Sequence, residues 1–144
     1  MNIASILATK GDKVVTVRGE QSIREALGIL AQHNIGALVV VDTGMRPIGI
    51  LSERDIVRAA AKDEKVFPLL VNQLMTRDLV LGGPGDDLGA VGQTMVRRRI
   101  RHLPVVDGGK LVGMVSIGDV VKAQRDQYQG EVDTLQTIVM EHPL

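Results

Sequence analysis

A glycine, a serine and an aspartate recur at one spacing, Gly-x-x-Ser-x-x-Asp, in two places in the chain. The first occurrence ends in Ser52 and Asp55, and the second ends in Ser116 and Asp119. Each pair lies between an apolar segment typical of a strand and a segment with helical spacing. A helix N-terminus attracts phosphate through its dipole and its unbonded N–H groups, and a carboxylate can accept hydrogen bonds from a ribose diol. The pattern therefore indicates two candidate nucleotide sites.

The same pattern also has a purely structural interpretation. A serine that precedes an acidic residue by three positions can form a capping box, in which each side chain accepts a hydrogen bond from the other residue's amide. A duplicated helix would duplicate its cap. From spacing alone, both interpretations stay open.

Both occurrences belong to a longer internal repeat. Residues 49–57 align with 113–121 at an offset of 64, and residues 35–42 align with 100–107 at an offset of 65. The one-residue difference falls in a turn, where insertions are tolerated. We expect each copy to fold as β-α-β-β-α and the two copies to share one core.

The local patterns place these elements along the chain. The first copy should contain strands at 13–17, 36–41 and 48–51, a helix between Ser22 and Asn34, and a helix at 52–62. The second should contain strands at 79–81, 103–106 and 111–115, a helix capped by Asp87, and a long helix over about 116–141. We expect residues 1–66 to form the first repeat with an N-terminal segment, 67–125 the second repeat, and 126–144 a C-terminal helical extension.

The composition excludes several classes of function. The chain has 144 residues, 17 basic and 17 acidic side chains, no cysteine, and, apart from three histidines, only Phe67 and Tyr128 as aromatic rings. Thiolate chemistry and disulfides are excluded, and the aromatic platforms that stack single-stranded bases are missing. A neutral chain with one short basic run, Arg97–Arg101, does not indicate a nucleic-acid partner, and that run equally suits the end of a helix.

Neither catalysis nor membrane association is indicated. No nucleophile–base arrangement, metal-ligand spacing or phosphate-loop motif occurs, so we expect no enzymatic activity. The longest clean apolar run, 37–41, is far too short to cross a bilayer, and the N-terminus does not resemble a signal peptide. We expect a cytoplasmic protein.

One string in the second copy indicates a known family. Ile-Arg-His-Leu-Pro-Val-Val-Asp at 100–107, followed by Gly-Met-Val-Ser-Ile-Gly-Asp-Val-Val at 113–121, resembles the cystathionine-β-synthase-type (CBS) domain pair, or Bateman module. The first copy matches with Ile-Gly-Ala-Leu-Val-Val-Val-Asp and Gly-Ile-Leu-Ser-Glu-Arg-Asp-Ile-Val, so the resemblance spans roughly residues 5–125. It implies an α/β (α+β) fold: a tandem pseudo-twofold pair of β-α-β-β-α CBS repeats, here with a long C-terminal helix. It also implies two clefts for adenosine-containing ligands such as AMP, ATP, NAD(H) or S-adenosylmethionine.

The resemblance assigns roles by position. It implies that Asp55 and Asp119 hold ribose hydroxyls and that Ser52 and Ser116 lie near phosphate. Adenine in such modules rests on aliphatic side chains and backbone, which suits a chain with few rings.

Further candidates come from the neighbouring positions. Arg101 and His102 match positions that often supply phosphate-binding cations, and Arg54 is a further cation beside Ser52. Thr16 matches a position that often faces the base, and Ala37 is the first copy's counterpart of His102.

The two copies differ at these positions. Arg101 and His102 correspond to the uncharged Gly36 and Ala37, and Arg54 corresponds to Gly118. We therefore expect two unequal clefts, while the sequence leaves open which segments meet in which cleft.

These observations favour a non-catalytic regulatory module that binds an adenine nucleotide and signals to an unidentified protein target. We expect a homodimer, because Val121, Tyr128 and Leu135 recur every seven residues on the last helix and would be exposed on a single small module. The alternative is a ligand-free structural or interaction module. The sequence does not name the ligand.

Overall fold

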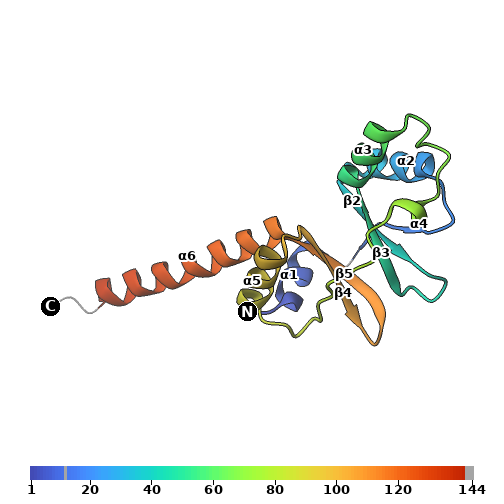
Figure 1. Cartoon of the computed structure of the whole chain (residues 1–144). Helices are drawn as coiled ribbons and strands as arrows, with labels where there is room; N and C mark the ends of the chain where they lie inside the picture. Colours follow the sequence, from blue (N-terminus) through green and yellow to red (C-terminus); the bar gives the residue numbers. More distant parts are fainter. Residues whose placement is uncertain (12, 142–144) are drawn as a thin grey trace.

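The computed structural model describes residues 1–11 and 13–141, which form alternating helices and strands (Figure 1). In chain order the elements are α1 (Ile3–Lys10), β1 (Thr16–Arg18), α2 (Ile23–His33), β2 (Ala37–Val41), β3 (Pro47–Ser52), α3 (Glu53–Lys62), α4 (Val71–Leu74), α5 (Leu88–Arg98), β4 (His102–Asp107), β5 (Lys110–Ser116) and α6 (Ile117–Glu141). The mixed fold and the long C-terminal helix confirm the predicted fold class.

The first repeat has the predicted β-α-β-β-α order. Strand β2 lies between β1, to which it is parallel, and β3, to which it is antiparallel. All five residues of β2 are buried, as its unbroken apolar sequence predicted. Helix α2 begins where the Ser22 side chain accepts a hydrogen bond from the Glu25 amide, and it ends where Asn34 adopts a left-handed conformation at φ 51°. Both ends confirm the expected caps.

The second repeat is less regular than predicted. The expected strand at 79–81 is wrong, since only Gly82 pairs with β4, through an isolated parallel bridge. The Gly82 amide donates to the Pro104 carbonyl and the Val106 amide donates to the Gly82 carbonyl. To extend this parallel ladder toward residues 79–81, the backbone N of Pro104 would have to donate the next hydrogen bond, and proline has no N–H. In the first repeat the corresponding residue is Val39, and there the ladder continues to Thr16.

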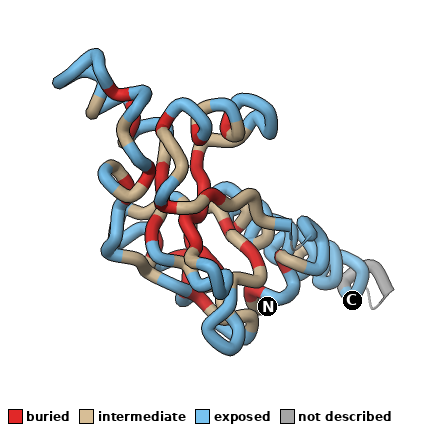
Figure 2. Tube along the Cα trace, turned by 90° about the vertical axis from the view of Figure 1, so that its right-hand side faces the viewer, coloured by how far each residue is buried: buried red, intermediate tan, exposed pale blue. Residues whose placement is uncertain are grey.

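The repeats do not share one core, contrary to the expectation from sequence. Two separate clusters of buried side chains form instead, one in each repeat, and buried positions are concentrated in and around the strands (Figure 2). The first cluster includes Val17, Ile23, Ala26, Leu30, Leu38, Val40, Leu51, Ile56, Val66, Val71 and Met75. The second includes Ile3, Ile6, Leu88, Val91, Met95, Leu103, Val105, Val115 and Val120.

The short helices α1 and α4 pack in a crossed arrangement. Helix α1 lies at the start of the chain, yet Ile3 and Ile6 belong to the second cluster, and the Ile3 amide donates to the Asp86 carbonyl at 3.0 Å. Helix α4 precedes the second repeat, yet Val71 belongs to the first cluster. Each repeat is therefore completed by the segment that leads into the other. The division of the chain near residue 66 stays a prediction.

Helix α6 begins at the end of β5 and extends well beyond the second repeat (Figure 1). Its bounds match the predicted range. Val120 is buried in the second core, but Tyr128 and Leu135 are 67% and 63% exposed. Within the described residues, no helix is both long enough and apolar enough to span a bilayer.

Candidate functional site

Both Ser-x-x-Asp elements form capping boxes at strand-to-helix junctions. At the start of α3 the Ser52 amide donates to Asp55 Oδ2 at 2.9 Å, and the Asp55 amide donates to Ser52 Oγ at 3.2 Å. At the start of α6 the corresponding bonds between Ser116 and Asp119 are 2.8 and 3.0 Å. The structural interpretation of the pattern is thus confirmed, and the ligand-binding interpretation stays a prediction.

Fewer backbone N–H groups are free to bind a ligand at the N-termini of α3 and α6 than the sequence suggested. The Glu53 amide donates to the Gly36 carbonyl at 2.9 Å, and the Asp55 amide is taken by Ser52. The Ile117 amide in the second repeat likewise donates to the Arg101 carbonyl. Because these first-turn donors are already bonded, an anion at the start of α3 must depend mainly on side-chain cations.

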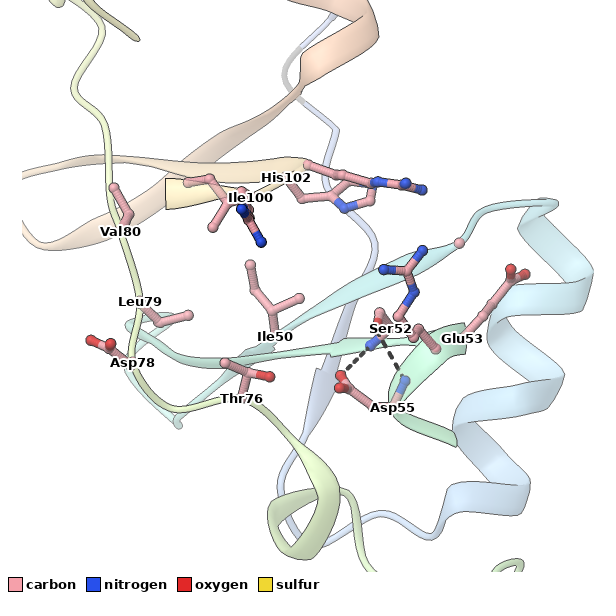
Figure 3. A pocket seen from close by; sticks show the side chains of 14 residues that line it. Ile50, Ser52, Glu53, Asp55, Thr76, Asp78, Leu79, Val80, Ile100 and His102 are labelled. Atoms are coloured by element: carbon pink, nitrogen blue, oxygen red, sulfur yellow. Dashed lines mark hydrogen bonds between the residues drawn. The ribbon is translucent and has the colours of Figure 1, made fainter. Parts of the chain in front are cut away.

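A cavity of about 430 Å³ lies between the two repeats, next to the first capping box (Figure 3). Its volume falls within the usual range for small-molecule sites. Ile50, Ser52 and Asp55 line it from the first repeat, while Ile100 and His102 approach from the second. The full lining is Gly36, Ile50, Ser52, Glu53, Arg54, Asp55, Thr76, Asp78, Leu79, Val80, Arg99, Ile100, Arg101 and His102.

Cationic side chains from both repeats converge on this cavity. Arg54 comes from the first turn of α3, whereas Arg99 and Arg101 flank the entry to β4. Arg99 ends α5 in a left-handed conformation, with φ 54°. The acidic lining consists of Glu53, Asp55 and Asp78, so the cavity combines carboxylates with a cluster of guanidinium groups.

His102 lines the same cavity and is half-buried. Burial lowers the pKa of His102 below its ordinary 6.5, and the positive charges of Lys10 and Arg101 lower that pKa further against the opposing effect of Asp119. At neutral pH the imidazole is therefore uncharged, and the positive charge of the cavity comes from its arginines.

Five of the nine residues singled out from sequence meet in this cavity, namely Ser52, Arg54, Asp55, Arg101 and His102. The structure does not bring the other four there. Thr16 lies in β1 opposite Val39, and Ala37 is buried at the start of β2 opposite Ser52. Ser116 faces His102 across the β4–β5 ladder.

Sequence reasoning missed one whole wall of the cavity, formed by Thr76, Asp78, Leu79 and Val80. The Thr76 amide and carbonyl exchange hydrogen bonds with Ile50 at 2.8 and 3.0 Å, which fixes this segment against β3. The sequence predicted a strand at 79–81, but no local pattern showed that residues 76–80 would lie against β3 and line a cavity. Arg99 and Gly36 were also missed, although both adjoin positions that the repeat alignment had singled out.

Asp119, the second repeat's counterpart of Asp55, is engaged by a lysine. Lys10 at the end of α1 donates to Asp119 Oδ2 at 2.6 Å and to the Met114 carbonyl at 2.9 Å. Partial burial raises the pKa of Asp119, but the hydrogen bonds from Lys10 and from the Ser116 amide outweigh that effect and hold the pKa below its ordinary 3.8. Asp119 is therefore ion-paired, and it does not line the cavity beside Asp55, which we call the first cavity.

Replacing Lys10 by methionine should flatten the loss of stability in acid. A carboxylate whose folded-state pKa is lowered contributes stability that is present above its ordinary pKa and is lost as the pH falls through the folded-state value. For Asp119 that loss begins near pH 4 and continues downward. Both partners are partly exposed, so we expect a difference of less than about 1 kcal/mol. Urea unfolding at pH 6 and pH 3 measures it, with Lys62→Met as the control, and equal losses in Lys10→Met and wild type would contradict the pairing.

Comparison with known proteins agrees with this arrangement. The CBS domain family matches residues 4–62 and 71–126, so the chain belongs to the CBS domain family and carries two copies of its domain. A CBS domain-containing protein of Bacillus subtilis is 36% identical over 122 residues, which cover 85% of this chain and 86% of that protein.

Solved structures share the fold. A CBS-domain containing protein from Agrobacterium tumefaciens superposes with a TM-score of 0.81 at 39% identity, covering 86% of this chain and 99% of that chain. The CBS domain pair of protein MJ0100, solved in complex with 5′-methylthioadenosine and S-adenosyl-L-methionine, gives a TM-score of 0.76 at 26% identity, covering 88% of this chain and 98% of its own. At least one similar CBS pair thus binds adenosyl ligands.

Proposed function

We propose that this chain is a non-catalytic regulatory module that binds a phosphorylated adenosine ligand, such as AMP, ATP or NAD(H), in the cavity between its repeats. The observation that carries the proposal is the convergence of Asp55, Arg54 and Arg101 on one cavity. A carboxylate suits the ribose diol, and guanidinium groups suit phosphate because they bind it in a bidentate manner.

The remaining lining fits the adenine ring. Ile50, Leu79, Val80 and Ile100 supply apolar surface from both repeats. Among the described residues, neither Phe67 nor Tyr128 lines the cavity, so we expect the base to lie between aliphatic side chains and backbone. Because the lining comes from both repeats, a bound ligand would bridge them and bias their relative packing, which gives a means of signalling to a protein target.

The adenosyl ligands bound by the MJ0100 domain pair support the nucleoside part of the proposal. The phosphate part rests on this chain's own arginines. S-adenosylmethionine carries a sulfonium cation, which the arginines would repel, whereas a phosphate would neutralise them. A cytoplasmic location belongs to the same proposal, since such a sensor needs access to the cellular nucleotide pool.

A thermal-shift panel tests this function. AMP, ADP, ATP, NAD, NADH, S-adenosylmethionine and 5′-methylthioadenosine are each added to the full chain. A ligand that binds only the folded state stabilises it by about 2.7 kcal/mol at a hundredfold excess over Kd. We expect the phosphorylated ligands to raise the melting temperature most. If none of the panel raises it, a ligand-free interaction module is the better description.

We also propose that α6 pairs with α6 of a second copy. Val121, Tyr128 and Leu135 are all more than half exposed and recur every seven residues along the helix. Light scattering at micromolar concentration should give twice the chain mass of 15.5 kDa. Leu135→Glu should give the single-chain mass, while the adjacent exposed substitution Gln136→Glu should not. A single-chain mass for the wild type would contradict the pairing.

A further inference from the structure

The equivalent aspartates of the two repeats differ in whether a cation is paired with them. Asp55 and Asp119 occupy the same place in their capping boxes, 64 residues apart. Asp119 carries an ion pair with Lys10, whereas among the described side chains no cation lies within ion-pair distance of Asp55. Leu7 of α1 and Met75 after α4 pack against the equivalent glycines Gly113 and Gly49, so the counterpart of Lys10 is Asp78. A carboxylate cannot form such a pair with Asp55, so the difference follows from the sequence.

The Lys10 ammonium also donates to a carbonyl whose counterpart in the first repeat is bonded by a residue of the cavity wall. In the first repeat the Ile50 carbonyl accepts a hydrogen bond from the Thr76 amide at 2.8 Å, and Thr76 lines the cavity. Met114 is the second repeat's counterpart of Ile50, and its carbonyl accepts from Lys10 at 2.9 Å. The ammonium group therefore reaches into the region of the second repeat that corresponds to the first cavity's edge.

Helix α1 holds Lys10 firmly in this position. Ile3 is fully buried in the second core, and the Ala4 amide donates to the Pro84 carbonyl at 2.8 Å. Gly113 lets the helix approach β5, because a Cβ at that position would lie 2.7 Å from a methyl carbon of Leu7. The packed helix fixes the backbone of Lys10, so pairing with Asp119 costs only the rotamer freedom of the lysine side chain.

From this difference we propose that Lys10 binds Asp119 and blocks the site in the second repeat that corresponds to the first cavity. The module would then bind one nucleotide per chain, in the first cavity. The ammonium shares Asp119 Oδ2 with the Ser116 amide and also binds the Met114 carbonyl, so a ribose at the remaining oxygen, Oδ1, would lie against the ammonium group. A ligand must displace the ammonium before it can bind there. The inference rests on the proposed function of the first cavity. It makes Lys10 the residue that determines how many ligands the pair of repeats accepts.

Calorimetric titration with AMP tests the inference through the binding stoichiometry. We expect one AMP per chain for the wild type and two for Lys10→Met, which keeps most of the aliphatic length but removes the charge. The second site should disappear again in the double variant Lys10→Met/Asp119→Ala. Lys62→Met removes a lysine from the exposed end of α3 and should keep one site. Thermal unfolding of each variant verifies that it is folded.

The outcomes separate this inference from the proposed function. Two AMP molecules on the wild type, or one on both wild type and Lys10→Met, would overturn the closure by Lys10 and leave the first site intact. No AMP on the wild type, with one on Lys10→Met that Asp119→Ala removes, would overturn the proposed first site and support the closure. No AMP on either protein would overturn both.

Discussion

Asp55→Ala is expected to weaken nucleotide binding by about 10- to 100-fold. Hydrogen bonds to a charged group contribute about 1.5–3 kcal/mol each, and 1.4 kcal/mol corresponds to a tenfold change in Kd. Asp55 lines the cavity between the repeats and already accepts the Ser52 amide through one oxygen, Oδ2. Its other oxygen suits a ribose hydroxyl. Calorimetric titration of AMP into the variant measures the loss.

The same substitution also removes half of a capping box, so its effect on stability must be separated from its effect on binding. Loss of the cap should lower the free energy of unfolding by about 0.5–1 kcal/mol. Asp87→Ala is the matched control, because Asp87 caps α5 by accepting the Ala90 amide at 3.0 Å and does not line this cavity. If Asp55→Ala loses stability like the control but keeps its affinity for AMP, the aspartate is a helix cap and nothing more.

Arg101→Ala is expected to distinguish ligands with phosphate from ligands without it. The Arg101 side chain is exposed at the cavity, while its carbonyl accepts the Ile117 amide, a bond that the substitution leaves in place. Affinity for AMP and ATP should fall about 10-fold or more at low salt, through loss of one charge-assisted contact. Affinity for adenosine and 5′-methylthioadenosine should stay unchanged.

A remote arginine provides the control for charge. Arg125→Ala on α6 removes one exposed positive charge outside the cavity lining, so it changes the net charge equally. Raising the salt concentration should shrink the difference between Arg101→Ala and wild type, since the arginine is exposed to solvent. An equal loss of affinity for AMP and adenosine in Arg101→Ala would mean that this side chain shapes the cavity without meeting the phosphate.

The sequence predicted the repeats well because each repeat carries strong local signals. Caps at Ser22 and Asp87, the left-handed exit at Asn34 and the buried strand at 37–41 all lie where the pattern placed them. The repeated Ser-x-x-Asp spacing singled out Ser52 and Asp55, and the family resemblance added Arg101, His102 and the neighbouring Arg54, which meet them in the first cavity. These features depend on neighbours in the chain, which spacing can reveal.

Features that depend on distant contacts were missed. Ile3, Ile6 and Leu7 have helical spacing, so a signal for α1 was present, but nothing local shows that the helix joins the second repeat's core. The pairing of Lys10 with Asp119 spans 109 residues. The absent strand at 79–81 depends on Pro104, whose missing N–H ends a ladder in a partner segment far along the chain.

Nuclear magnetic resonance titration with AMP tests the central claim most directly, because it reports both binding and location. The claim is that one phosphorylated adenosine ligand sits between the repeats, beside Asp55. Amide signals of Gly36, Ser52 and Arg101 should shift together and saturate at a single Kd, while those of Lys10 and Asp119 should stay in place. Shifts confined to Lys10 and Asp119, or no shifts at saturating AMP, would contradict the account.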